Sequence, residues 1–287
     1  VSFVVAIPLF FYLARSSLGT VPSLCGGLIC LTAPLLQDYA HQVMSEVPYL
    51  AFSLGALYLL RRAADHPAVR GNHWLLAAFL CTMAAYYIRT VGIVLIAAAV
   101  LFFLLRGQRI KALAFFGAAL VAWLPWTLRN RAVGSGGVYL QQLLQVNPYF
   151  PDQGLLDVGG LVDRIVQNAA AYYLHIVPSI GRYPEPYRGQ GALFEPLSLV
   201  LVLSLFYAGV QAYRGRRDLL LFVYTLLFLG TVVLWYWSGD RFLIPILPML
   251  LYFTIRAVTD LLWVLANRGL HSSLGRVFTA ALVVAVL

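Results

Sequence analysis

Long apolar segments are the feature that most limits the fold of this chain. They recur along nearly all of its 287 residues, as blocks rather than at amphipathic spacing. Hydrophobic residues make up 61% of the chain and charged residues 11%, which is typical of a protein that crosses a membrane many times. We therefore predict an all-α fold, a polytopic transmembrane helix bundle over residues 1–287. Its nine or ten apolar segments are 1–14, 21–36, 47–60, 74–88, 91–105, 112–128, 192–213, 219–237, 242–266 and the partial 277–287.

The net charge of +9 does not indicate a nucleic-acid partner. The basic residues fall in small clusters between apolar blocks, where anionic lipid headgroups and the positive-inside bias account for them. Cys25, Cys30 and Cys81 all lie inside apolar segments and form no C-x-x-C pair, which favours small hydrophobes over redox or metal chemistry. Membrane lipids are thus the expected surroundings, and no nucleic acid is expected.

The distribution of arginines predicts the orientation. If the chain enters from the outer face and alternates, the inner connections carry most of the basic residues, whereas the short outer ones carry only Arg89 and Arg241. Most acids fall on the outer side. We therefore predict a multi-pass protein of the plasma (inner) membrane with its active site facing the outside or periplasm.

Segments 74–88 and 91–105 are short for membrane crossings. At ~1.5 Å per residue each is about 22 Å long, against a hydrocarbon core of about 30 Å. Both flanks are basic and hence internal, which favours a short intramembrane hairpin with Arg89 at its tip. A guanidinium at that depth needs a wet cavity or an anion. The alternative is that Arg89 extends to the outer headgroups.

Residues 129–191 form the one long connection, predicted to be extracytoplasmic. Within it, "LVDRIVQNAAAYYLHIV" has apolar residues at helical spacing, at 161, 165, 169, 172, 173 and 176. This pattern predicts an amphipathic helix that lies on the outer membrane surface or caps a cavity. The following "PSIGRYPEPYRGQG" is rich in proline and glycine, which predicts an irregular loop.

Polar and ionisable residues gather at the outer ends of several segments. They are Asp38, His41 and Glu46 in "QDYAHQVMSE", Arg89, Arg129 and Arg131 in "PWTLRNR", and Asp240 and Arg241 in "WSGDRFLIPILP". Arginines can bind the oxygens of a lipid phosphate, and carboxylates can hold a divalent cation or activate a hydroxyl group. The alternative is that these residues pair with one another and hold helix ends together.

The motifs "MSEVPYLAFSLGALYLLRRA", "YYIRTVGIVLIAAAVLFFLLRG", "PWTLRNRAVGSG" and "GDRFLIPILPMLLYF" occur in this order along the chain. No single motif is stringent, but the ordered set resembles the multi-spanning glycosyltransferases of the GT-C class. The closest group is family-39-like and includes bacterial aminoarabinose and protein-mannosyl transferases. The resemblance extends from about Val1 to Tyr252.

This resemblance implies a polyprenyl-phosphate sugar as donor and transfer on the outer face to a lipid, glycan or protein acceptor. It places Glu46, with Asp38, in the catalytic cavity and Arg241 on the donor phosphate. Arg89 matches the basic residue at the hairpin tip. The remaining polar residues, His41, Arg129, Arg131 and Asp240, are expected to bind substrate. No cofactor is firmly implied, although Glu46 is a candidate ligand for a divalent metal.

In one respect the chain departs from the family pattern. It begins at Val1 inside an apolar run, and the family's first outer loop, whose acidic pair supplies the general base, would lie before Val1. We therefore expect an N-terminally truncated chain, with activity belonging to its parent protein. There, an acceptor would attack the anomeric carbon with inversion as the polyprenyl phosphate departs.

Aromatic residues of the long connection have two interpretations. They could stack on the sugar or the prenyl chain, or form an interfacial aromatic belt. The residues are Tyr149, Phe150, Tyr172, Tyr173, Tyr183 and Tyr187.

Two rival functions remain open from the sequence. A transporter or lipid-linked-sugar flippase would be expected to carry broken helices or charges at the bilayer midplane. An oligosaccharide polymerase or ligase would share the outer arginines, so topology does not separate it from a transferase. The transferase is favoured over the transporter because the ionisable residues sit at helix ends on one face.

Overall fold

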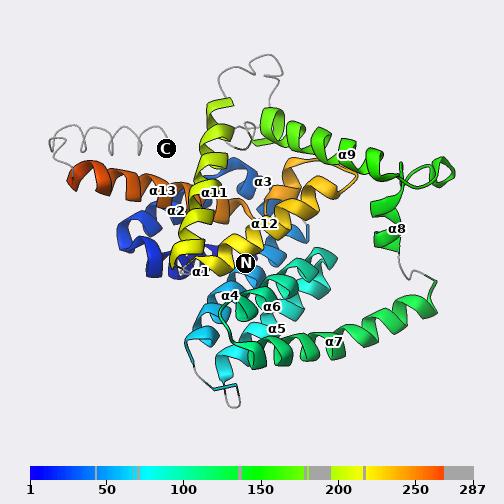
Figure 1. Ribbon diagram of the computed structural model, residues 1–287, viewed down its shortest axis with the longest axis horizontal. Helices are drawn as coiled ribbons and strands as arrows, with labels where there is room; N and C mark the ends of the chain where they lie inside the picture. The colour runs from blue at the N-terminus through cyan, green and yellow to red at the C-terminus, as the bar shows by residue number, and fades with distance from the viewer. Residues whose placement is uncertain are drawn as a thin grey trace.

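The computed structural model describes residues 1–42, 44–66, 68–69, 72–134, 138–177, 180, 195–215 and 218–267. Within these residues every regular element is a helix, apart from one isolated bridge between Gln145 and Leu155. The predicted all-α fold is thus confirmed (Figure 1). The apolar segment 277–287, Tyr183, Tyr187 and nearly all of the predicted loop at 178–191 lie outside the described residues.

The helices follow the predicted apolar segments closely. The first half contains α1 (Ser2–Leu18), α2 (Thr20–Thr32), α3 (Pro34–His41), α4 (Glu46–Asp65), α5 (His73–Ile88), the 3-10 turn η1 (Thr90–Gly92), α6 (Ile93–Leu105) and α7 (Arg109–Ala132). The second half contains α8 (Val138–Leu144), η2 (Pro151–Gln153), α9 (Val158–Ala171), the π-helical turn η3 (Tyr172–Ile176), α11 (Glu195–Gly215), α12 (Leu219–Leu234), η5 (Asp240–Leu243) and α13 (Leu247–Asn267).

Among the described helices, three are long and apolar enough to cross a membrane, namely α7 and most of α11 and α13. A fourth span results if α2 and α3, which meet at a bend of 53°, are counted as one broken helix. Shorter apolar helices, among them α1, α5 and α12, pack around them. The chain is therefore a multi-pass membrane protein.

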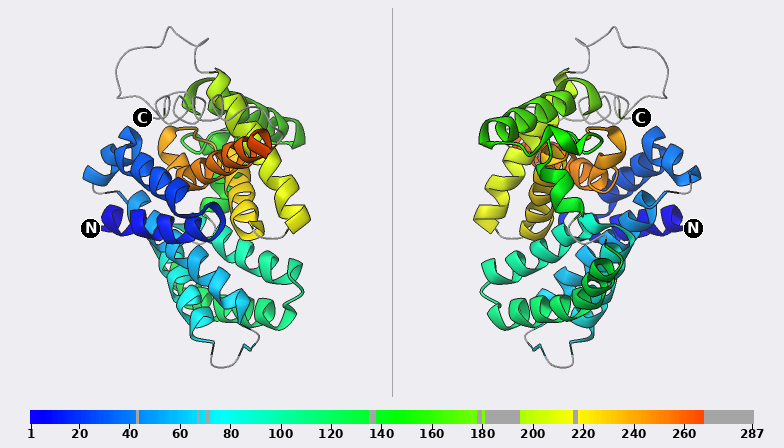
Figure 2. Two further views of the ribbon diagram at one scale, coloured as in Figure 1. Left: turned by 90° about the vertical axis from the view of Figure 1, so that its left-hand side faces the viewer. Right: turned by 90° about the vertical axis from the view of Figure 1, so that its right-hand side faces the viewer.

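Helix α4 lies at the centre of the bundle. It packs against α5 and α1 and also contacts α3, α6 and α12. Thirteen of its 20 residues are buried, whereas α7 buries only four of 24 and directs large apolar side chains such as Val121 outward, as a lipid-facing helix does. In Figure 2, the helices α4 to α7 form the lower part of the molecule and α9, α11 and α13 the upper part.

The end of α4 at Asp65 is capped by side chains from distant segments. Its last carbonyl groups have no partners inside the helix and must find donors elsewhere. The ammonium of Lys111 donates to the carbonyls of Ala63, at 2.8 Å, and His66. The amide of Gln108 donates to the carbonyl of Ala64 at 2.7 Å. A buried lysine here is also favoured by the negative end of the helix dipole.

Near the same end, one carboxylate joins four helices. Asp218 is 5% exposed and precedes α12. Its Oδ1 accepts hydrogen bonds from the Arg61 guanidinium of α4 at 2.8 Å, the Tyr252 hydroxyl of α13 at 2.6 Å and the Ser17 hydroxyl of α1 at 3.0 Å. The four helices are therefore held together by one buried ion pair and its hydroxyl donors.

Replacing Asp218 by alanine should lower the free energy of unfolding by about 3 kcal/mol, because it leaves the Arg61 guanidinium in the bundle without its carboxylate. The measurement is unfolding of the purified protein by SDS in mixed micelles. Asp65→Ala is the matched control, since the Asp65 carboxylate is 66% exposed and lies 3.7 Å from Arg106. That control should cost less than about 1 kcal/mol. Equal losses in the two variants would contradict the role given to Asp218.

Candidate functional site

The ion pair between Glu46 and Arg89 is the centre of the candidate site. Glu46, the first residue of α4, is 3% exposed, and its Oε1 accepts from the Arg89 guanidinium at the end of α5. Arg89 also donates to the Ser45 hydroxyl at 3.4 Å, and its side chain is 20% exposed. The Arg89 guanidinium is therefore engaged by a buried carboxylate of the bundle.

The second carboxylate oxygen of Glu46 has no hydrogen-bond partner in the described structure, although it is buried. A carboxylate oxygen shielded in this way costs free energy unless a donor reaches it. Glu46 also lies at the beginning of α4, where the helix dipole attracts a negative charge. Glu46 therefore has one oxygen bound by Arg89 and one buried oxygen without a donor among the described residues.

A close backbone approach sets the position of Arg89. Its backbone N–H bonds the Ala85 carbonyl, and η1 then folds back against the end of α5. A Cβ at Gly92 would lie 2.5 Å from the Cα of Tyr86, so only glycine fits there. This tight turn lies where the hairpin tip was predicted, around "IRTVG".

Tyr39 joins helix α3 to the second part of the site. Its hydroxyl donates to Oδ1 of Asp240 at 3.4 Å, and the same oxygen accepts from the Arg241 backbone N–H at 2.7 Å. Tyr39 lies within electrostatic range of Asp240, Arg241 and Glu46. Helix α3 therefore brings residues separated by some 200 positions, 39 and 240, into one cluster.

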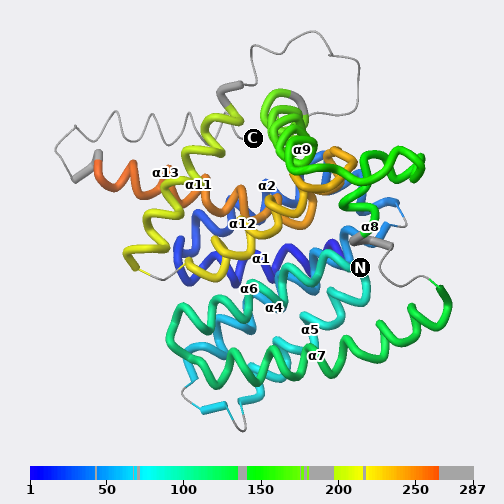
Figure 3. The backbone as a smooth tube through the Cα atoms, turned by 45° about the vertical axis from the view of Figure 1, so that its right-hand side comes forward, coloured from blue at the N-terminus to red at the C-terminus, as the bar shows by residue number. Residues whose placement is uncertain are grey.

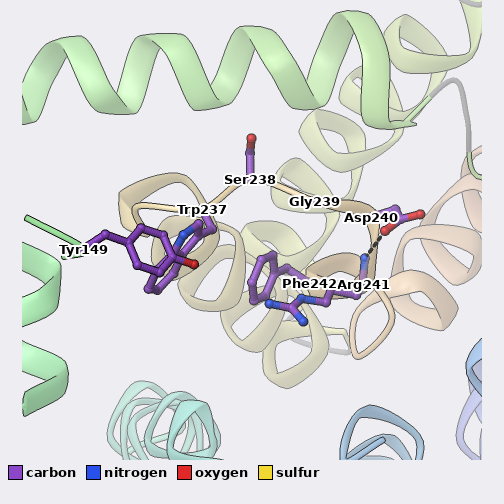
Figure 4. A pocket seen from close by; sticks show the side chains of 7 residues that line it. All are labelled: Tyr149, Trp237, Ser238, Gly239, Asp240, Arg241 and Phe242. Carbon is purple, nitrogen blue, oxygen red and sulfur yellow. Dashed lines mark hydrogen bonds between the residues drawn. The ribbon is translucent and has the colours of Figure 1, made fainter. Parts of the chain in front are cut away.

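Arg241 differs from Arg89 in having no carboxylate on its guanidinium within the described part of the chain. It is exposed and lies over the Phe242 ring, 4.8 Å from the ring centroid. It lines a pocket of about 390 Å³ together with Tyr149, Trp237, Ser238, Gly239, Asp240 and Phe242 (Figure 4). This guanidinium is therefore available to an anion that enters the pocket.

Helix α9 holds the pocket segment in place. It lies across the ends of the neighbouring helices (Figure 3). The Asn168 amide donates to the carbonyls of Val233 at 2.9 Å and Trp235 at 2.7 Å, which end α12. The Tyr172 hydroxyl donates to the Gly239 carbonyl and accepts from the Gly239 N–H, both at 3.2 Å. The backbone is thus fixed on either side of Trp237.

The buried face of α9 differs in composition from the prediction. A helix was predicted here with an apolar face, but the residues most deeply buried are Arg164 and Asn168, one turn apart. Arg164 donates to the carbonyls of Leu143 at 2.7 Å and Gln145 at 2.5 Å. Exposed Val162 and Val166 lie away from these contacts. Polar side chains therefore hold α9 against its neighbours, because the ends of α8 and α12 present backbone carbonyls that need donors.

Burial raises the pKa of the Tyr172 hydroxyl, and the hydrogen bond from the Gly239 N–H opposes this only in part. The phenol is consequently neutral at ordinary pH. It can then donate to one group of Gly239 and accept from the other at the same time.

The remaining predicted site residues lie at the edges of this cluster or beyond it. Asp38 and His41 share α3 with Tyr39, and both are exposed without polar contacts among the described residues. Arg129 and Arg131 are exposed at the end of α7, which extends to the edge of the molecule (Figure 1). Arg129 lies over Trp126 and bonds Asn130, and neither arginine contacts Glu46 or Asp240.

The described residues do not assemble a complete metal site. No three of the His, Cys, Asp and Glu side chains in the described ranges come together as a ligand set. Around Glu46 the nearest ionic neighbour is the cation Arg89, which opposes a second positive charge. The residues present therefore do not fit the divalent metal considered from the sequence, and no step is assigned to one.

Comparison with known families adds to this geometry. A family model described as dolichyl-phosphate-mannose-protein mannosyltransferase matches residues 1–128. The first 128 residues are therefore similar to this family of membrane glycosyltransferases. No curated protein and no solved structure gave a match. The family match covers less than half of the chain, and it includes Glu46 and Arg89 but ends before Asp240 and Arg241.

Glu46 and Arg89 should show strong energetic coupling in a double-mutant cycle. Each single alanine variant leaves a buried or half-buried charge without its partner, whereas the double variant leaves none, so the coupling should be at least about 1 kcal/mol. SDS titration of the four proteins measures it.

Arg129 supplies the matched control, since it is an exposed arginine that does not contact Glu46. Glu46→Ala and Arg129→Ala should add to within about 0.5 kcal/mol. If Arg89 proves no more coupled to Glu46 than Arg129 is, the ion pair does not form in the folded protein.

Proposed function

We propose that this protein transfers a sugar from a polyprenyl-phosphate-linked donor to a lipid, glycan or protein acceptor on the extracytoplasmic face of the plasma (inner) membrane. The observation that carries the proposal is the arrangement around Tyr39. Glu46, a buried carboxylate with one unpartnered oxygen, lies within electrostatic range of Tyr39. Asp240, which accepts from the Tyr39 hydroxyl, lines a pocket together with Arg241, whose guanidinium has no carboxylate partner among the described residues. The family match over residues 1–128 supports the same reaction class.

Arg241 is assigned to the donor phosphate. Its guanidinium faces the pocket and, in the described chain, competes with no carboxylate for its donor groups. An arginine fork can bind two phosphate oxygens at once. As the bond from the anomeric carbon to the phosphate breaks, negative charge grows on the leaving phosphate. A fixed cation at that position stabilises the transition state more than the ground state.

Glu46 is assigned to the sugar or the acceptor. Its free Oε2 can accept a hydrogen bond from a hydroxyl group, while Arg89 holds the other oxygen and fixes the direction of the carboxylate. Asp38, an exposed carboxylate one residue before Tyr39, is the acid of this chain that we assign to take the proton of the attacking acceptor. Attack on the anomeric carbon opposite the departing phosphate then inverts its configuration. The outer-face location rests on the positive-inside argument.

The transporter alternative receives less support from the placement of charge. Three buried charged groups, Glu46, Lys111 and Asp218, each lie within one turn of a helix end and are engaged there by fixed partners. Inside the span α13, Arg256 is paired with Asp260 at 2.7 Å and is thereby neutralised. A translocation path would be expected to place such groups near the middle of the spans. The pocket also lies between loops and helix ends rather than between helix centres.

Glu46→Gln and Arg241→Ala should each reduce sugar transfer at least about 100-fold, because each removes a charge that faces the reacting groups. The assay is transfer of radiolabelled mannose from polyprenyl-phosphate mannose to the acceptors in native membranes. Membrane insertion should persist in both variants.

The control is Arg106→Ala, which removes an arginine from a partly exposed pair at the other end of the bundle. It should retain transfer within about twofold, as expected for a weak surface pair. Wild-type turnover in the Glu46 and Arg241 variants would remove the basis of this site assignment.

A further inference from the structure

The pocket beside Arg241 has an aromatic wall that the assignments above do not use. The ring of Trp237 meets that of Tyr149 edge-on, with centroids 5.4 Å apart. Trp235 and Tyr236 pack around the same indole, at 5.7 and 5.2 Å. In Figure 4, Tyr149 and Trp237 lie together at one end of the pocket and Arg241 with Phe242 at the other. The cavity therefore has an aromatic end and a cationic end.

The indole N–H of Trp237 points to a ligand. Its Nε1 is shielded from solvent and has no acceptor among the described residues. An indole nitrogen can only donate, and buried donors without an acceptor are rare in folded proteins. Trp237 is one of the residues that line the cavity, so an acceptor atom could reach it from that side.

The backbone around Trp237 is held from both directions. Asn168 binds the Trp235 carbonyl, and Tyr172 binds both polar groups of Gly239. Arg241 follows two residues later and belongs to the same short 3-10 turn as Asp240. A rigid segment of this kind fixes the distance between the indole and the guanidinium, which is a requirement for recognising two parts of one molecule.

We propose that this pocket binds the sugar of the donor, with a sugar hydroxyl accepting the indole N–H of Trp237 at the edge of its ring and the sugar packed against Tyr149. The inference rests on the proposed function, since it takes Arg241 as the phosphate-binding residue. A sugar phosphate has its ring and its phosphate adjacent, as the two ends of the pocket are. The cavity volume of about 390 Å³ lies within the range of small-molecule sites. Trp237 is then the residue that distinguishes a glycosylated lipid phosphate from a bare one.

Two probes test this with the purified protein in detergent. One is a short-chain polyprenyl-phosphate mannose and the other is the same polyprenyl phosphate without a sugar. Trp237→Phe should weaken binding of the mannose-bearing probe about five- to tenfold, the effect of one lost hydrogen bond, while the bare phosphate keeps its affinity. Arg241→Ala should weaken both probes. Trp263→Phe, on the exposed face of α13, should change neither.

Two further measurements separate recognition from folding. Trp237→Phe should leave the apparent melting temperature unchanged or raised, because it removes a buried donor that has no partner. Tyr149→Ala, at a side chain that is 71% exposed, should repeat the selective loss without disturbing the fold.

Other binding results would contradict the inference or the proposed function. Equal weakening of both probes by Trp237→Phe would assign the aromatic wall to the prenyl chain or phosphate and overturn the inference. No weakening of either probe would overturn it as well. If the wild-type protein binds neither probe, the proposed function fails and the inference fails with it. If both probes bind with the same loss in Arg241→Ala but Trp237→Phe has no effect, only the inference fails.

Discussion

A helix that is buried along its length can carry charge only where a partner meets it, and α4 carries charge at both ends. Glu46 at its beginning is met by Arg89, and Arg61 near its end is met by Asp218. Since most of the remaining residues of α4 are buried against other helices, these two pairs determine its position along the bundle axis. The Glu46–Arg89 pair of the candidate site and the four-helix contact at Asp218 both meet the need of a charge on a buried helix for a partner of opposite charge.

The two arginines of the candidate site, Arg89 and Arg241, differ in their charged neighbours. Arg89 is already neutralised by Glu46, so its attraction for a further anion is reduced. Arg241 has only an aromatic ring beneath it among the described residues and retains its full charge. This difference supports a division in which Arg89 orients a carboxylate and Arg241 binds substrate. A sequence comparison that treats both as basic residues would miss it.

The helical segments could be predicted from the sequence, because hydrophobic blocks are local features. The pairing of Glu46 with an arginine was only the alternative that the charges at block ends left open. The contribution of Tyr39, Asn168 and Tyr172 could not be predicted. Each acts on a group that is far away in the sequence, and two of them bind backbone carbonyls, which no residue pattern marks. Arg129 and Arg131 were predicted to join the cluster, but the end of α7 that carries them lies at the edge of the molecule. The sequence pattern shows where a helix ends but not how far that end lies from other helices.

The capping of α4 by Lys111 also constrains the order in which the protein can be assembled. The carbonyls of Ala63 and His66 precede their donor by 48 and 45 residues, and Arg61 precedes Asp218 by 157. During synthesis the carbonyls at the end of α4 are therefore made before the donors that cap them, whereas Arg61 can already bond Leu13 and Ser17 of α1. The capping of α4 is complete only after α7 has begun, and the ion pair with Asp218 forms only when the start of α12 arrives.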